Sequence, residues 1–266
     1  MGAVFALPLT RPPERLDEYG QPCYTVQQAK GLAETQGDQL LAPIIASGYL
    51  ATVATGLRRA VVEEIDRLRD GRLVDIVELG GATGRMFNFL EPASRTYINV
   101  EPGHFVIENR ALDRLRHAKY AGIKCSAESI PLPDQSCDIV FAMASFGHIP
   151  DADRALAEVG RLLRPGGSFL LVMNNRRSWW KAALANTRYL QRRQAIIAQD
   201  HFVQWSADEC ERALAAHLTV SKVYSQTFVP YVPHVWRVLL PIADAVGPWL
   251  NPRAGANLVV ISEKPR

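Results

Sequence analysis

The sequence predicts an α/β fold built on a doubly wound, mostly parallel β-sheet. Between about residues 73 and 174, five short apolar runs rich in strand-forming residues alternate with segments of helical length. Glycine and proline residues lie where strand-to-helix turns would be required. This alternation is typical of βαβ units around a buried parallel sheet.

Composition favours one large domain, or one domain with an inserted lid. The chain has 266 residues, of which 48% are hydrophobic and 21% are charged, so it can bury a full core. Neither disorder nor a fibrous structure is indicated. The formal net charge of +3 is small and the basic residues are spread along the chain, so no strong polyanion-binding surface is expected.

The sequence gives no sign of a secreted, membrane-spanning or metal-binding protein. Its opening, MGAVFALPLTRPPE, has a short apolar run with no positive residue before it, so we expect no signal peptide and a cytoplasmic location. No stretch approaches the ~18 apolar residues of a membrane helix. The cysteines show neither CxxC pairs nor zinc-type Cys/His spacing, which predicts reduced thiols and no metal site; they are Cys23, Cys125, Cys137 and Cys210.

The elements expected in the first two thirds of the chain follow from periodicity. Residues 1 to 22 are rich in proline, glycine and charge and are predicted to form an arm, and residues 24 to 68 are helical. We expect the strands at residues 73–79, 95–101, 120–126, 137–143 and 168–174. Residues 1–72 are therefore predicted to be an arm and helical cap, and residues 73–175 the core.

The remaining residues, 176–266, are predicted to form a lid insertion and then the strands that complete the domain. The expected elements are a long helical stretch at 176–199, a helix at 206–217, a strand at 218–225 and a last strand near 255–265. An apolar segment from Val232 to Leu250 contains several prolines. This segment either contacts a membrane or lipid or forms a packed lid. The prolines and the strand that follows favour the lid.

A glycine-rich turn after the first predicted strand is the strongest local signal. In VDIVELGGATGRMF the strand ends at Leu79 and a helix is expected from Thr83 or Gly84. Small residues let a backbone approach a ligand and point helix N–H groups at it. Glu101 lies twenty-one residues after Gly80, where an acid can accept hydrogen bonds from ribose hydroxyls. A plain tight connection and a solvated carboxylate remain the alternatives.

The spacing of this turn separates two kinds of nucleoside ligand. A dinucleotide GxGxxG motif starting at Gly80 requires glycine where the chain has Ala82 and Arg85. The turn instead resembles the acidic-x-Gly-x-Gly-x-Gly motif of Rossmann-like S-adenosylmethionine-dependent methyltransferases, from Glu78 to Gly84, with alanine at the middle glycine. The resemblance implies a seven-stranded sheet, S-adenosyl-L-methionine as cofactor and S-adenosyl-L-homocysteine as product.

The resemblance extends over residues 73 to 174 and is to the branch related to ubiquinone and menaquinone methyltransferases. The matching residues are Ser126-Ala127-Glu128, Ile130-Pro131, Asp138, His148 with Asp151, Glu158 with Arg161, and Arg164-Pro165-Gly166-Gly167. The departure is Ser126, where the family often has an aspartate that hydrogen-bonds the adenine amino group. A serine or the neighbouring backbone would have to replace that contact.

By this resemblance, the cofactor's carboxypropyl end lies over the glycine turn and its ribose meets Glu101. Its adenine lies beside Pro102, Ala127 and Glu128. The sulfonium would face the loop from Ala144 to His148. The predicted cofactor-binding residues are Glu78, Gly80, Gly81, Ala82, Gly84, Glu101, Pro102, Ser126, Ala127, Glu128, Ala144 and Ser145.

Methyl transfer is an in-line displacement that depends on holding the acceptor about 3 Å from the methyl group. A hydroxyl acceptor must also lose a proton, which makes His148 a candidate general base; its alternative role is to order the loop. His201 is a second candidate. Four aromatic residues in or next to the insertion either line an apolar acceptor pocket or belong to the core; they are Trp179, Trp180, Tyr189 and Trp205. Five basic residues there either steer an anionic acceptor or form a solvated face; they are Arg176, Arg177, Arg188, Arg192 and Arg193.

We therefore predict methylation of a small-molecule or lipid-like acceptor, on oxygen rather than carbon or nitrogen. Two other classes stay open: an adenosylmethionine-binding protein without methyl transfer, and a nucleotide-dependent oxidoreductase or sugar-modifying enzyme, which should prefer the missing GxGxxG. A nucleic acid acceptor is disfavoured, because AMASFGH replaces the Asn/Asp-Pro-Pro-aromatic motif of amino-methylating enzymes. The sequence does not specify the oligomeric state.

Overall fold

The computed structural model describes residues 7–17, 20–25, 48–103, 113–188, 191, 201–230 and 235–266. Seven strands form one central sheet in the order β5-β4-β3-β6-β7-β9-β8. They are β3 (Val74–Leu79), β4 (Ser94–Val100), β5 (Tyr120–Ile123), β6 (Cys137–Met143), β7 (Leu163–Asn174), β8 (Thr219–Gln226) and β9 (Asn257–Glu263). β9 runs antiparallel to β7 and β8, and the other adjacent pairs are parallel, which confirms the predicted fold class.

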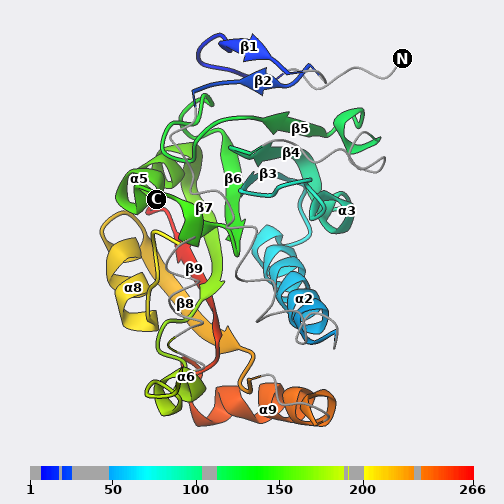
Figure 1. The fold of residues 1–266 in the computed structure, drawn as a ribbon. Helices are drawn as coiled ribbons and strands as arrows, with labels where there is room; N and C mark the ends of the chain where they lie inside the picture. The colour runs from blue at the N-terminus through cyan, green and yellow to red at the C-terminus, as the bar shows by residue number, and fades with distance from the viewer. Residues whose placement is uncertain are drawn as a thin grey trace.

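Helices cover both faces of this sheet and bury a separate apolar cluster on each (Figure 1). On one face lies α2 (Tyr49–Arg69), whose Leu57, Val61 and Ile65 pack together with α3 (Phe87–Leu90). The other face is covered by α5 (Ala152–Leu162) and α8 (Ala207–Ala215). All six side chains of β3 are buried, as expected for a central parallel strand with helices on both sides.

Ion pairs fix the amino ends of the central strands, opposite the edge where the glycine turn lies. The carboxylate of Asp75 contacts Arg95 at 2.8 Å and Arg164 at 3.0 Å, and Arg164 also pairs with Asp138 at 2.8 Å. Glu158 and Arg161 hold the loop at Ile130 by hydrogen bonds to its backbone: Glu158 accepts the N–H of Ile130, and Arg161 donates to its carbonyl. These residues of the resemblance therefore have a structural function.

The N-terminal arm forms a separate two-stranded sheet beside β5. The short strands β1 (Arg15–Leu16) and β2 (Pro22–Cys23) pair with each other, and Cys23 forms a parallel bridge with Lys124. Leu7 and Leu9 pack against the core cluster that contains α5 and α8. Residues 26–47 of the predicted helical segment 24–68 lie outside the described residues, and α2 confirms the last part of the segment.

Two predicted helices differ from the structure. Helical geometry after the glycine turn begins only at Phe87, because the left-handed backbone at Ala82 and Gly84 cannot be part of a right-handed helix. Within the stretch 176–199, α6 (Trp179–Ala183) has only five residues before turns interrupt it. Residues 189, 190 and 192–200 lie outside the described part of the chain.

The C-terminal part adds α9 (Trp236–Leu250) between the two last strands. Trp236 and Leu240 of this helix pack against Tyr49 at the start of α2, and the Tyr49 and Trp236 rings meet edge to face. In the described residues, no helix combines the length and apolar character needed to cross a bilayer. All four cysteines are buried and free, in agreement with the predicted reduced thiols.

Candidate functional site

The predicted site residues lie at the carboxyl ends of β3, β4, β5 and β6, Glu78 within β3 and the others on the loops that follow the strands. The chain order reverses at β3, which has β4 on one side and β6 on the other. In open α/β sheets, ligands bind outside the carboxyl ends of the strands at this reversal. The structure therefore brings the glycine turn, Glu101 and the Ala144 loop to one edge of the sheet.

The turn after β3 has an unusual backbone. Gly80, Ala82 and Gly84 have φ angles of 69°, 47° and 67°, all in the left-handed region. An L-residue there is strained by roughly 1–2 kcal/mol. Ala82 nevertheless adopts the conformation that a glycine favours at the middle position of the motif. The turn therefore remains left-handed although alanine replaces the middle glycine of the motif.

Close packing explains why the flanking positions are glycine. A Cβ atom on Gly80 would lie 2.4 Å from Cβ of Ser145, and one on Gly84 would lie 2.2 Å from the hydroxyl of Tyr120. Ser145 is itself fixed, because its hydroxyl donates to the carbonyl of Leu79 at 2.5 Å. The loops that follow β3 and β6 thus pack directly against each other.

The carboxylate of Glu101 lies against this turn at the end of β4. One oxygen accepts the N–H of Ala82 at 2.8 Å, and the other accepts the N–H of Gly103 at 2.7 Å. Each carboxylate oxygen can accept a second hydrogen bond. The side chain is therefore held in place with capacity left for two further donors, which fits a pair of ribose hydroxyls.

Asn99, which was not predicted from the sequence, organises the same turn. Its Nδ2 donates to the carbonyl of Ala82 at 3.0 Å and to the hydroxyl of Tyr120 at 3.1 Å, and its Oδ1 accepts the N–H of Gly81 at 3.2 Å. The signal available in the sequence was an amide inside the otherwise apolar run YINV. A buried polar side chain in a central strand requires partners.

Glu78, the acid that opens the motif, is only 3% exposed. Burial raises its pKa to about 7, while the hydrogen bond donated by the Tyr97 hydroxyl lowers it. Arg114, also missed from the sequence, donates from Nε to the carbonyl of Thr83 at 2.9 Å. Its Nη2 is buried and has no hydrogen-bond partner in the described part of the chain. The turn therefore rests on a buried acid and a buried arginine.

The three residues Ser126, Ala127 and Glu128, expected at the adenine end, are buried, and the two polar ones are hydrogen-bonded within the protein. The hydroxyl of Ser126 donates to the carboxylate of Glu128, which also accepts the N–H of Asp151 at 3.3 Å. Ala127 belongs to the apolar cluster on this face. Ser126 therefore uses its hydroxyl within the protein, whereas Pro102, next to Glu101 in the chain, is half-buried.

The loop after β6 begins with Ala144, which is exposed and has a φ of 58°. A short 3₁₀ helix, η1 (Phe146–His148), follows. The rings of His148 and His201 lie 4.2 Å apart, and Gly147 accepts backbone hydrogen bonds from Phe202 and Val203. The structure thus brings together the two histidines predicted as separate candidates, because the chain after the insertion folds back on this loop.

The aromatic and basic residues of the predicted insertion are divided between core and surface. Trp180 is buried, and Trp205 packs against Phe146 in the core. Trp179 is about half exposed, and Tyr189, Arg192 and Arg193 lie outside the described residues. An open cavity of about 690 Å³ is lined by Arg176, Arg177, Lys181, Ala182, Ala185 and Gln204; Arg188 is exposed nearby in sequence.

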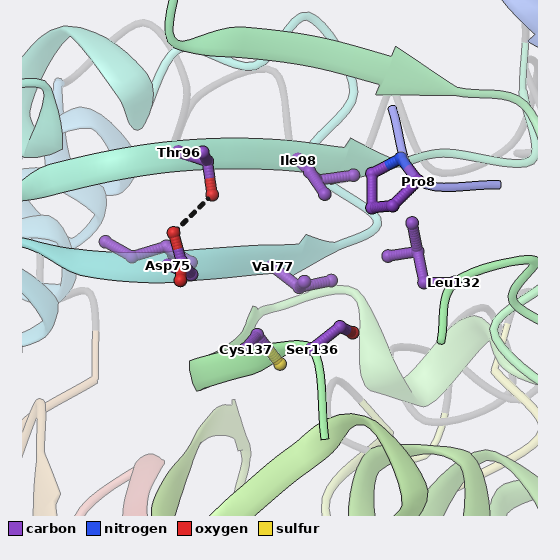
Figure 2. A pocket seen from close by; sticks show the side chains of 9 residues that line it. Pro8, Asp75, Val77, Thr96, Ile98, Leu132, Ser136 and Cys137 are labelled. Carbon is purple, nitrogen blue, oxygen red and sulfur yellow. Dashed lines mark hydrogen bonds between the residues drawn. The ribbon is translucent and has the colours of Figure 1, made fainter. Parts of the chain in front are cut away.

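A second cavity, of about 180 Å³, lies beside the amino-terminal parts of β3 and β4 (Figure 2). Pro8 of the arm points toward it, and the hydroxyl of Thr96 donates to Asp75 at 2.8 Å along its wall. Its lining includes none of the predicted site residues. This cavity is a packing feature beneath the arm rather than part of the candidate site.

The sheet order and the glycine turn at the carboxyl edge of β3 define a Rossmann-like α/β fold. Residues 77–171 match the family model described as a methyltransferase domain. The matched stretch contains the glycine turn, Glu101 and the loop with both Ala144 and His148.

Curated relatives match the same part of the chain. An uncharacterized methyltransferase of Mycobacterium tuberculosis is 36% identical over 116 residues, which are 43% of this chain and 45% of that protein. A ubiquinone/menaquinone biosynthesis C-methyltransferase of Rubrivivax gelatinosus is 34% identical over 106 residues, 40% of this chain and 41% of that protein. The chain thus aligns with less than half the length of these relatives.

Solved structures share the fold at low identity. The YcgJ protein of Bacillus subtilis has a TM-score of 0.56 at 17% identity, covering 80% of this chain and 99% of that one. An S-adenosylmethionine-dependent methyltransferase of Thermotoga maritima gives 0.51 at 18%, covering 85% and 98%. The [4+2]-cyclase SpnF gives 0.55 at 14%, covering 92% and 99%. At this identity they establish the fold and nothing finer.

Proposed function

We propose that this protein is an S-adenosylmethionine-dependent methyltransferase that acts on a small-molecule or lipid-like acceptor. The observation that carries the proposal is the half-buried carboxylate of Glu101 against the left-handed turn at Ala82, at the strand reversal of a methyltransferase domain. A phosphoethanolamine N-methyltransferase of Haemonchus contortus, solved in complex with S-adenosyl-L-methionine, shares the fold, with a TM-score of 0.55 at 13% identity.

In this proposal the chain's own groups hold the cofactor at the carboxyl edge. Glu101 accepts hydrogen bonds from the ribose, and the Gly80–Gly84 turn lies beneath the carboxypropyl end. When bound, the cofactor supplies an electrophilic methyl group. Ala144 and Ser145 border the place where the acceptor must approach in line with that group.

Calorimetric titration with S-adenosylmethionine and S-adenosylhomocysteine, beside NAD and NADP, tests the cofactor. Micromolar binding of the first pair is expected, and Glu101→Ala should weaken it by roughly tenfold to a hundredfold because two charge-assisted hydrogen bonds are lost. The matched control is Glu63→Ala, which removes an exposed carboxylate from α2. Dinucleotide binding, or no binding by a folded sample, would reject the proposal.

The acceptor atom is part of the same proposal. We favour oxygen, because the paired rings of His148 and His201 supply a candidate base beside the loop after β6. Relatives named for C-methylation of quinones, and for methylation of phthiotriol dimycocerosates in Mycobacterium tuberculosis, support a lipid-like acceptor. Mass spectrometry of the product formed from a methyl-labelled cofactor distinguishes an O-methyl from a C-methyl product.

Binding of the cofactor without methyl transfer is the second candidate. The neighbour SpnF, a [4+2]-cyclase, shows that this fold is also used for other chemistry. Under that alternative, Glu101→Ala still weakens cofactor binding, but no S-adenosylhomocysteine forms with any acceptor.

A cytoplasmic location stays part of the proposal.

A further inference from the structure

The helix α9 presents an apolar face to solvent. Its outward stripe, called the α9 stripe below, consists of Val238, Leu239, Ile242, Val246, Trp249 and Leu250. Val238 is 65% exposed and Trp249 is 89% exposed. Single exposed apolar residues are common on protein surfaces, but a contiguous group of this kind marks an interaction surface.

The stripe is a regular feature of the helix and not a frayed end. At about 100° per residue its six members cover an arc of about 120°. The opposite side of the helix carries Trp236, Leu240 and Gly247, which are buried against the rest of the molecule. The helix is therefore apolar on both sides, and its inner side alone accounts for its packing on the protein.

The end of the molecule that carries the α9 stripe also carries cations. The acid of the helix, Asp244, is turned inward, where it accepts the N–H of Phe228 at 2.8 Å. Arg237 is exposed on the flank of the helix, about 100° around the axis from Val238 at the edge of the stripe. Arg177 and Lys181 line the open cavity beside α6, and the backbone N–H of Trp179 in α6 donates to the carbonyl of Ala254, just beyond α9. Cations and apolar side chains thus lie at one end of the molecule.

The position of α9 connects this surface with the candidate site. The helix follows β8, which runs parallel to β7 because both are antiparallel to β9. The carboxyl ends of β7 and β8 therefore share the sheet edge that carries the glycine turn and His148. Figure 1 shows α9 and α6 at the end of the molecule opposite β1 and β2.

We propose that the α9 stripe docks this protein on the surface of an anionic lipid bilayer. An amphipathic helix of this kind lies in the plane of the interface and inserts its apolar face about 5–10 Å into the boundary of headgroups and acyl chains. Tryptophan is favoured at this depth, since its ring combines a large apolar area with a polar N–H. Docking through α9 turns the acceptor side of the sheet toward the lipid.

A second copy of the chain fits this surface less well. A helix of 15 residues is about 22 Å long and about 10 Å wide, which offers a small contact face. Stable protein interfaces bury about 800 Å² on each partner. A bilayer needs no complementary partner surface, and an anionic bilayer also attracts the cations at the same end of the molecule.

Flotation of the full-length protein with lipid vesicles tests the proposal without any assay of methyl transfer. We expect binding to vesicles of phosphatidylcholine mixed equally with phosphatidylglycerol, weaker binding to phosphatidylcholine alone, and loss of binding at high salt. Val238→Glu and Trp249→Glu should each reduce the bound fraction about tenfold or more. The matched control is Leu16→Glu on β1, a residue that is 61% exposed at the opposite end of the molecule.

Unfolding temperatures of the variants show that they are folded, since both positions are largely exposed. Equal binding by wild type and the two α9 variants, equal binding to neutral and anionic vesicles, or no binding by wild type would overturn the proposal. So would a dimer seen by light scattering that the same variants dissociate in the absence of vesicle binding. Cofactor titration is independent of these outcomes, so failure of lipid docking is distinguishable from failure of the proposed methyltransferase activity.

Discussion

At the scale of single residues, the buried carboxylate of Glu78 is the most consequential group in the candidate site. It lies beneath the glycine turn, accepts a hydrogen bond from Tyr97 and has a pKa raised to about 7 by burial. In the unfolded chain the same group would titrate near its ordinary value of 4.5. The folded state therefore binds this proton more tightly than the unfolded state does.

This difference makes stability depend on pH in a definite direction. The contribution of Glu78 is fully favourable below about pH 4.5 and declines as pH rises toward 7, because the carboxyl group must then ionise in an apolar environment. Glu78→Gln should remove the decline, so the variant gains up to about 3 kcal/mol relative to wild type between pH 4.5 and 8. Urea unfolding at both pH values measures the gain.

The exposed Glu63→Gln serves as the control for this measurement, because its carboxylate lies on the solvent side of α2. It should leave the difference between the two pH values unchanged. An unchanged difference in Glu78→Gln as well would show that Glu78 is ionised in the folded protein at neutral pH.

At the scale of elements, strand ends and helix starts position the site. The turn between β3 and α3 is held by Asn99 and Glu101, both from the neighbouring strand β4. The loop after β6 ends where Asp151 caps α5, its carboxylate accepting the N–H of Arg154 at 3.1 Å. The aspartate of the His-x-x-Asp pattern is thus explained by helix capping rather than by contact with a ligand.

Substitution of Asp151 tests this capping role. Asp151→Ala should lower the free energy of unfolding by about 1 kcal/mol, whereas Asp151→Asn should have little effect because asparagine caps helices equally well. Denaturant unfolding measures both changes. If Asp151 contacted the ligand through its charge, the asparagine variant would lose cofactor or acceptor binding at wild-type stability, and the capping explanation would fail.

At the scale of the whole molecule, the parallel sheet gathers distant parts of the chain at one edge. His201 reaches His148 only because the segment after the insertion returns to the loop of η1, where Phe202 and Val203 bond to Gly147. A Cβ atom on Gly147 would lie 2.4 Å from the His201 ring, so the contact depends on glycine there. The same edge carries α6 and the end of β8 that leads to α9.

This arrangement predicts different roles for the two histidines in O-methylation. His148→Gln should reduce kcat by roughly 10²- to 10⁴-fold, because the glutamine amide cannot accept the acceptor's proton. His201→Gln, which removes only the neighbouring ring, should reduce kcat less. Initial rates of methyl transfer measure both effects.

The surface substitution His217→Gln controls for general effects of removing a histidine, because His217 pairs with the exposed Asp153. A full rate in His148→Gln would assign this residue to loop ordering and would favour an acceptor that needs no base.

Much of the fold followed from the sequence by itself. The β6 bounds agree with the apolar run 137–143, and the turn was located from Gly80 and Gly84, because strand periodicity and glycine positions are local properties of a chain. The short length of α6 and the start of α3 only at Phe87 could not be predicted from the sequence. Both depend on backbone conformations that neighbouring elements impose.

The sequence alone thus determined the α/β class, the location of the glycine turn, the position of Glu101 near the end of the following strand and the resemblance to methyltransferases. Only the tertiary structure decided that Asn99, Tyr97 and Arg114 support the turn, that His201 lies against His148, and that the outer face of α9 is exposed. The physical reason is that hydrogen-bond partners and burial depend on which distant segments meet, and sequence spacing does not encode those meetings directly.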